Sequence, residues 1–285
     1  MEKLLLPSSN IFRDESVFDP AFRSEVIPHR EKEHSLLSQL FLTLITNPNS
    51  ISRKILITGP PHTGKSKIIK IFANMLLHAG EKRHVNFYIP FLSCYDHNTR
   101  QQLLAQLCEQ LPSRWKRIIY RIRDLICHPK TYTQRKSHFL IILDDFEFYR
   151  DDWDELLESI TSRVVRNRNL TRVSYITIIS NEQILEKKTL NPKLRRNMLR
   201  FSPYSKNQLF DILKYRANLG FKPGIVSDDH IAMVVDYVFK KQDGITYGLE
   251  ILRKAGKFAE NDHRNFIRFE DVRNAIFCIY KVYYE

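Results

Sequence analysis

Features that mark several other classes of protein are absent from this 285-residue sequence. Its 4 cysteines form no Cys-x-x-Cys pair and no zinc-binding spacing, so we expect neither a disulfide framework nor a zinc site. No apolar run approaches the roughly 20 residues of a membrane-spanning helix. The apolar stretch near the start is too short and too broken for a signal peptide. We therefore expect a cytoplasmic protein that has no membrane partner.

Positive charge is what the sequence has in excess. Lysine and arginine number 45 against 32 aspartates and glutamates, which gives a formal net charge of +13. Such a surplus favours an anionic partner, either nucleic acid or an acidic protein surface, although a basic surface can also serve solubility alone. Hydrophobic residues make up 43% of the chain, which is ordinary for a globular protein, and the length suffices for two domains.

The pattern with the clearest chemistry is a phosphate loop, in which two glycines bracket four residues and are followed by a lysine and a hydroxyl. A short apolar strand at 55–57 precedes it and a helical run at 68–76 follows it. The glycines let backbone amides turn towards phosphate oxygens, and the helix adds its positive end. We expect Lys65 to reach the β- and γ-phosphates and Ser66 to bind Mg²⁺. The predicted site for ATP or ADP comprises Gly59, Pro60, Pro61, His62, Thr63, Gly64, Lys65, Ser66 and Lys67.

Two further apolar runs end in polar residues that suit phosphate chemistry. The run 139–143 ends in Asp144 and Asp145, and the run 175–179 is followed by Ser180 and Asn181. We expect Asp144 to hold Mg²⁺ and Asp145 to polarise the attacking water. Asn181 is expected to hydrogen-bond that water or the γ-phosphate, because catalytic groups collect at the carboxyl ends of parallel strands. The alternatives are an acidic pair that merely ends a strand and a polar turn residue.

The order of apolar patterns predicts an α/β fold followed by a helical domain. Short strands near 55–57, 85–89, 139–143 and 175–179 alternate with helices, as in a doubly wound parallel sheet. Past residue 201 only helical patterns remain, at 205–219, 228–240, 246–260 and 270–282. We therefore expect an α/β nucleotide-binding core over residues 1–200 and a small all-helical domain over residues 201–285.

With these motifs in place, the chain resembles the AAA+ initiator ATPases of DNA replication, and among them the archaeal proteins related to the origin-recognition-complex and cell-division-cycle loaders. The similar segments lie at residues 11–18, 27–31, 59–66, 143–145, 179–181, 201–205 and 249–256. The resemblance implies an AAA+ core with a helical lid. It also implies that Pro28, His29 and Arg30 lie against adenine and that Tyr204 and Arg216 contact the nucleotide.

The sequence departs from the pattern of that family at three places. Thr246 stands where the family has an arginine that touches the γ-phosphate, and a hydroxyl cannot offset phosphate charge as a guanidinium does. Asp144-Asp145 replaces the usual Asp-Glu pair. The chain ends at Glu285, where family members continue into a winged-helix DNA-binding domain. We expect ATP hydrolysis, if it occurs, to be weak or slow.

The resemblance also points to surfaces for DNA and for other subunits. Residues 93–111 take the place of an insertion that touches DNA in initiators, and a helix with a basic face is expected just beyond it. Phosphate contacts from such a face give salt-dependent affinity, although a charged run is often only a solvated helix face. The candidate DNA-contacting residues are Arg114, Lys116, Arg117, Arg121 and Arg123. Arg195 and Arg196 fall near the family's arginine that reaches a neighbouring subunit's ATP.

Two functions are compatible with these residues. The first is an ATP-controlled, nucleoid-associated protein of the replication-initiator type that binds DNA. The second is a nucleotide-binding interaction module that assembles with other initiator subunits or replication proteins and does not read DNA itself. The charge of +13 favours the first, and Thr246 favours the second. A metabolic kinase fits poorly, because no motif for an acceptor substrate is present.

Overall fold

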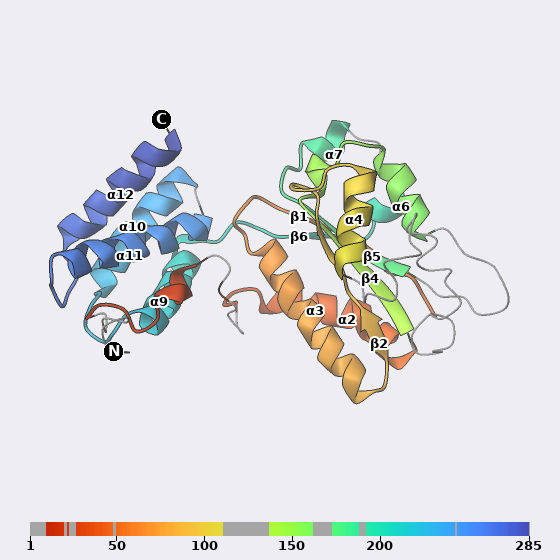
Figure 1. Cartoon of the computed structure of the whole chain (residues 1–285), viewed down its shortest axis with the longest axis horizontal. Helices are drawn as coiled ribbons and strands as arrows, with labels where there is room; N and C mark the ends of the chain where they lie inside the picture. The colour runs from red at the N-terminus through yellow and green to blue at the C-terminus, as the bar shows by residue number, and fades with distance from the viewer. Residues whose placement is uncertain are drawn as a thin grey trace. The chain divides into compact units, whose positions relative to one another are not determined.

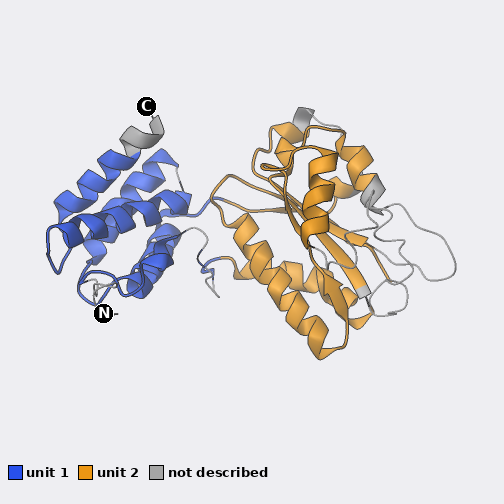
Figure 2. Cartoon of the chain, in the orientation of Figure 1, with its two compact units in different colours: residues 1–29, 203–285 blue, residues 30–202 orange. Residues whose placement is uncertain are grey.

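The structure of the chain is a computed structural model that describes residues 10–19, 22, 27–47, 50–110, 137–161, 173–187, 192–242 and 244–284. It forms two compact units, each described separately below (Figure 2). The core unit is Arg30–Ser202, and the helical unit joins Met1–His29 to Pro203–Glu285. The second boundary lies close to the one expected near residue 200, but the first was not expected.

The core unit is built on a parallel sheet, as the sequence predicts. Its strands are β1 (Lys54–Thr58), β2 (Asn86–Tyr88), β3 (Phe91–Ser93), β4 (Ser137–Asp144), β5 (Val173–Ile179) and β6 (Met198–Arg200). They are ordered β2-β4-β5-β1-β6 (Figure 1). These neighbouring strands run parallel, and β3 also pairs in parallel with β4. Both short strands thus lie along one side of β4 and are separated by Pro90, which has no N–H to give to a ladder.

Helices cover both faces of this sheet. They are α2 (Glu31–Thr46), α3 (Lys65–Lys82), α4 (Arg100–Gln110), α6 (Trp153–Thr161), and the short α7 (Ile184–Lys187) and α8 (Pro192–Arg195). Alternate residues of β4 and β5 join Leu103 of α4 and Leu156 of α6 in one buried cluster. The intervening strand residues point to the opposite face and are buried as well, which explains why β4 has a continuous apolar run at 139–143.

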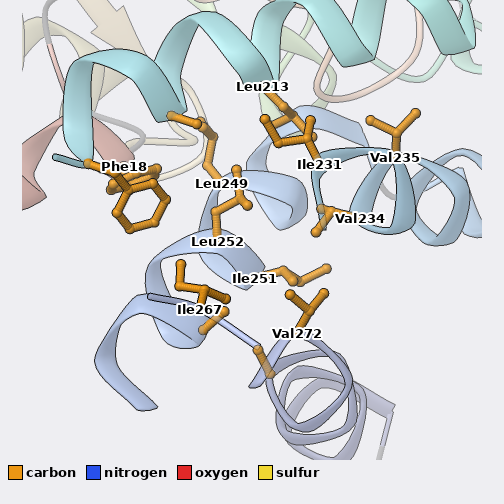
Figure 3. Close-up of a cluster of buried hydrophobic side chains, with 14 of the residues drawn as sticks. Phe18, Leu213, Ile231, Val234, Val235, Leu249, Ile251, Leu252, Ile267 and Val272 are labelled. Atoms are coloured by element: carbon orange, nitrogen blue, oxygen red, sulfur yellow. The ribbon is translucent and has the colours of Figure 1, made fainter. Parts of the chain in front are cut away.

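The helical unit has the four helices that the sequence predicts. They are α9 (Lys206–Gly220), α10 (Asp228–Lys241), α11 (Gly244–Asn261) and α12 (Phe269–Tyr284). Ser205 caps α9 in a capping box with Gln208, which fixes where that helix begins. Leu213, Val234 and Leu252 come from three different helices and meet in the buried core of the unit (Figure 3).

The N-terminal segment packs in this helical unit, so the expected assignment of residues 1–200 to the core needs correction. A 3₁₀ turn, η1 (Glu15–Phe18), brings Phe18 to within 4.6 Å of Phe221, measured between ring centroids. A Cβ on Gly220 would lie 2.4 Å from the Phe18 ring, so the glycine makes room for that ring. Glu15 completes the attachment by an ion pair of 2.7 Å with Lys257 of α11. Such packing between distant segments leaves no local sequence pattern.

In the part of the chain that the structure describes, no helix is both long enough and apolar enough to cross a membrane. The cysteines of this part, Cys94, Cys108 and Cys278, are all free thiols. Cys94 is buried in the hydrophobic core, and burial raises the pKa of its thiol.

A buried histidine links two central strands of the core. His138 of β4 is 0% exposed, and its Nε2 lies 2.8 Å from the hydroxyl of Ser174 in β5. The same hydroxyl accepts a hydrogen bond from the Arg53 amide. Burial lowers the pKa of His138 from 6.5 to about 4, because a charged imidazole would lose its hydration there.

This burial predicts an acid-sensitive core. The unfolded chain protonates His138 near pH 6.5, whereas the folded chain does so only near pH 4. The folded state therefore loses stability as pH falls through this window, by up to about 3 kcal/mol. Chemical denaturation of the wild type and of His138→Gln between pH 7 and pH 4 measures the difference. The variant should have a flatter pH dependence, and equal slopes for the two proteins would contradict the assignment.

Candidate functional site

The phosphate loop connects β1 to α3 and is shaped by its two glycines. Gly59 has a φ of 141°, and a Cβ at this position would lie 2.2 Å from the carbonyl oxygen of Phe201. Gly64 has a φ of 83° and is the N-cap residue of α3. Between them, the Thr63 hydroxyl donates to the Pro60 carbonyl over 2.9 Å. Neither glycine can therefore be replaced without strain, and the first is also enclosed by backbone.

Lys65 lies inside this loop. Its side chain is buried, and its Nζ donates hydrogen bonds to the carbonyls of Gly59 at 2.8 Å and Pro60 at 2.7 Å. Burial lowers the pKa of Lys65 from 10.5 to about 8, and the nearby carboxylates of Glu147 and Asp144 oppose that shift. A buried ammonium group whose hydrogen bonds go to neutral carbonyls would gain from direct contact with an anion such as a phosphate.

The two residues expected to hold Mg²⁺ lie together. The Ser66 hydroxyl donates to Oδ1 of Asp144 over 2.8 Å. Asp144 is 7% exposed, and burial raises its pKa from 3.8 to about 6, against the opposing effect of that hydrogen bond. Asp145 follows in a left-handed conformation with a φ of 52°, which aspartate tolerates better than most residues. Burial also raises the pKa of Asp145, and Lys65 opposes the shift.

Glu147 connects the ends of β4 and β5, a role that sequence reasoning missed. Its Oε1 accepts a hydrogen bond of 2.9 Å from the amide of Ser180. Burial raises its pKa, and it is the carboxylate that most favours the charged form of Lys65. Asn181 is exposed, and its Oδ1 accepts a hydrogen bond from the amide of Gln183 over 3.1 Å. In this structure the amide side chain of Asn181 therefore stabilises a turn.

Arg30 and its neighbours occupy two different units. Pro28 and His29 belong to the helical unit, where Nε2 of His29 lies 3.0 Å from Oδ2 of Asp211. Arg30 begins the core unit and is 4% exposed. Its guanidinium is hydrogen-bonded to protein groups, including the carbonyl of Thr63 in the phosphate loop. Sequence reasoning placed Arg30 near adenine and gave no sign of these bonds.

The other expected nucleotide contacts lie in the helical unit. Arg216 of α9 donates to the carbonyls of Val17 and Asp19, and its guanidinium carbon lies 4.9 Å from the ring centroid of Phe22. Burial lowers the pKa of Arg216. Tyr204 is buried in the apolar core of this unit, and Thr246 is half-buried in the first turn of α11. Arg216 thus attaches the N-terminal segment to α9.

The expected interaction surfaces are only partly described. Arg195 and Arg196 are exposed, and Arg195 donates to the Leu185 carbonyl over 2.9 Å. Residues 93–111, which take the place of the DNA-touching insertion, include α4. The candidate DNA-contacting residues Arg114, Lys116, Arg117, Arg121 and Arg123 lie outside the described residues.

Comparisons with known families match both units. The model of the AAA domain family matches residues 52–185, which contain the phosphate loop and the Asp144-Asp145 pair. The model of the Cdc6 AAA+ ATPase-type lid domain matches residues 210–276, within the helical unit. The chain therefore has an AAA+ core and a helical lid, as the resemblance implies, and it is similar to Orc1/Cdc6-type replication initiators.

Individual relatives are similar over nearly the whole chain. The chain is 28% identical to ORC1-type DNA replication protein 1 of Methanothermobacter thermautotrophicus, covering 93% of this chain and 69% of that protein. It is 27% identical to ORC1-type DNA replication protein 2 of Sulfolobus acidocaldarius, covering 95% and 68%. The Aeropyrum pernix ORC2 protein, solved with ADPNP and ADP, matches with a TM-score of 0.78 at 19% identity, over 93% of this chain and 72% of that one. The Aeropyrum pernix ORC1 protein in complex with DNA matches with a TM-score of 0.77 at 24% identity, over 95% and 71%.

The enclosure of Gly59 predicts that even a methyl group is not tolerated there. Gly59→Ala should lower the free energy of unfolding by about 2–4 kcal/mol, because it adds a clash with the Phe201 carbonyl to an unfavourable φ. Gly224→Ala is the matched control, since Gly224 has a φ of 78° but nothing lies within 4 Å of its added Cβ. The control should cost only about 1 kcal/mol. Urea denaturation measures both, and equal losses would contradict a steric role for Phe201.

Proposed function

We propose that the chain binds ATP in the phosphate loop of its core unit. The observation that carries this proposal is the buried ammonium group of Lys65, bonded to two loop carbonyls beside the Ser66–Asp144 pair. In the proposal, Lys65 exchanges its loop carbonyls for phosphate oxygens, and the loop amides and the start of α3 hold the rest of the triphosphate. Homology to proteins of the AAA+ family supports the same conclusion.

The residues beside the loop fit a Mg²⁺ ion. The Ser66 hydroxyl and the Asp144 carboxylate are oxygen ligands of the kind that Mg²⁺ prefers, and they already lie within 2.8 Å of each other. A carboxylate whose pKa burial has raised to about 6 also gains from a nearby cation. When bound, the ion would neutralise charge on the phosphate oxygens. Ser66 and Asp144 would hold it.

Hydrolysis in this proposal is slow, so that bound ATP acts as a switch. Asp145 would orient the attacking water, with a carboxylate one methylene shorter than glutamate. Asp145 directly follows β4, and its left-handed backbone conformation sets the direction of its side chain. Thr246 supplies no positive charge to the γ-phosphate, which removes one source of transition-state stabilisation.

DNA is the proposed partner of the nucleotide-bound protein. The net charge of +13 supports an electrostatic contact with phosphates. Similarity to ORC1-type DNA replication proteins, and to an ORC1 protein solved in complex with DNA, adds to that support. The proposed contacts are made by the basic residues between 114 and 123. An interaction module that assembles with other initiator subunits is the second candidate, and the neutral Thr246 favours it.

The ATP proposal predicts a specific loss of affinity in a lysine variant. Lys65→Ala should weaken Mg²⁺-ATP binding by about 10- to 100-fold, because charge-assisted hydrogen bonds to phosphate are lost. Isothermal titration calorimetry measures the affinity. Lys82→Ala is the matched control, since Lys82 is an exposed lysine at the far end of the same helix. If the wild type binds no adenine nucleotide, or if both variants bind ATP equally well, the proposal is wrong.

The DNA proposal predicts a strong dependence on salt. Affinity for duplex DNA should fall as salt rises, and the slope of log K against log salt should shrink by about 2 when two phosphate-contacting arginines are removed. Fluorescence anisotropy of the wild type and of an Arg117→Gln, Arg121→Gln double variant measures this change. A chain that retains DNA only when another initiator subunit is added would instead support the interaction module.

A further inference from the structure

Arg30 stands where the chain passes between its two units. It is the first residue of the core unit, and Ser202 is the last. Both residues are far from the phosphate loop in the sequence, yet the Arg30 side chain is hydrogen-bonded both to Ser202 and to the loop. The contacts described below all lie within the core unit.

Each nitrogen of the Arg30 guanidinium donates to a different group. Nε donates to the Thr63 carbonyl at 3.1 Å, and Nη1 donates to Oε1 of Glu33 at 2.7 Å. Nη2 donates to the Ser202 carbonyl at 2.7 Å. The guanidinium carbon also lies 5.2 Å from the ring centroid of Phe201. A charge that is 4% exposed is costly unless its bonds are made, so this geometry is held firmly.

The same segment supports the loop at a second point. The Phe201 amide donates to the Thr58 carbonyl over 2.7 Å, directly before the loop begins. Gly59 then passes so close to the Phe201 carbonyl that no side chain fits. The start of the loop therefore rests on Phe201, while Arg30 connects Thr63, later in the loop, to Ser202. The loop is therefore held at two separate points by the short segment 201–202.

We infer that Arg30 is a positioning residue that holds the phosphate loop against residues 201–202. This inference rests on the proposed function, because it assigns the loop a ligand whose phosphates need preformed amides. It differs from the contact with adenine that the family resemblance implies for Arg30. If Arg30 contacted the base, its loss would weaken the binding of one nucleotide. Because it positions the loop, its loss weakens the binding of every triphosphate equally. With its guanidinium committed to Thr63, Glu33 and Ser202, Arg30 acts through the loop.

The test compares ligands that share phosphates but differ in their base. Mg²⁺ complexes of ATP, GTP and inorganic tripolyphosphate are titrated into the full chain and into Arg30→Gln by calorimetry. The variant should weaken all the ligands that the wild type binds by the same factor, about tenfold, because a misplaced loop loses hydrogen bonds to phosphate. Arg200→Gln is the matched control, since Arg200 is a nearby, exposed arginine whose side chain forms an ion pair of 2.7 Å with Glu182. It should leave every affinity unchanged.

A conservative variant separates charge from geometry. Arg30→Lys keeps the charge but cannot reach three groups at once, so it should not restore the affinity. Glu33→Gln keeps the guanidinium and should weaken binding less than Arg30→Gln. It also provides the test if the Arg30 variants fail to fold. Equal binding by Glu33→Gln and the wild type would then overturn the inference.

Hydrogen exchange tests the inference without any ligand. In the unliganded protein, Arg30→Gln should speed exchange of the amides at 62–64 and 201–202, while α6 exchanges as in the wild type. Loss of ATP affinity alone, with tripolyphosphate binding and loop exchange unchanged, would overturn the inference. It would instead support a contact between Arg30 and the adenine base. A wild type that binds no nucleotide would instead refute the proposed function, and faster loop exchange in Arg30→Gln would still be expected.

Discussion

The close approach of Gly59 to the Phe201 carbonyl is the contact on which the site depends. It exists because β6 pairs with β1, so that Phe201 follows alongside the first residues of the phosphate loop. A side chain at 59 would push the loop away from the sheet, and the positive φ of Gly59 would be lost as well. The shape of the loop is therefore a property of the sheet edge as much as of the glycine-rich sequence.

Burial sets the electrostatics around that loop. Lys65 and the carboxylates Asp144, Asp145 and Glu147 are all partly or wholly removed from water, and burial is the largest cause of each pKa shift. The three acids favour the charged form of Lys65, and Lys65 favours the charged form of Asp145, which limits the shifts in the pKa of both groups. In such a cluster the lysine can stabilise an added anion and the carboxylates can stabilise an added cation. A site for a phosphate together with a divalent cation needs both.

Much of the fold and part of the site could be predicted from sequence. The continuous apolar run ending at Leu143 and the largely apolar run ending at Ile179 predicted buried parallel strands, because strands covered on both faces need no polar alternation. The edge strands β2, β3 and β6 are only three residues long, and two of them, β3 and β6, were missed, since so short a segment carries no periodicity. The phosphate loop and the proximity of Ser66 to Asp144 were predicted because the motif specifies local geometry and parallel strands end at one edge.

The sequence alone determined the phosphate loop, the order of the longer strands and helices, and the positive charge, because each depends on local spacing or on composition. Only the tertiary structure decided that residues 11–18 pack with the lid, that Glu147 joins two strand ends, and that Arg30 is bonded to Thr63 and Ser202. These contacts join residues up to about two hundred positions apart, as in Arg216 with Val17. Long-range packing and the burial of charge depend on which surfaces meet, and no local pattern records that.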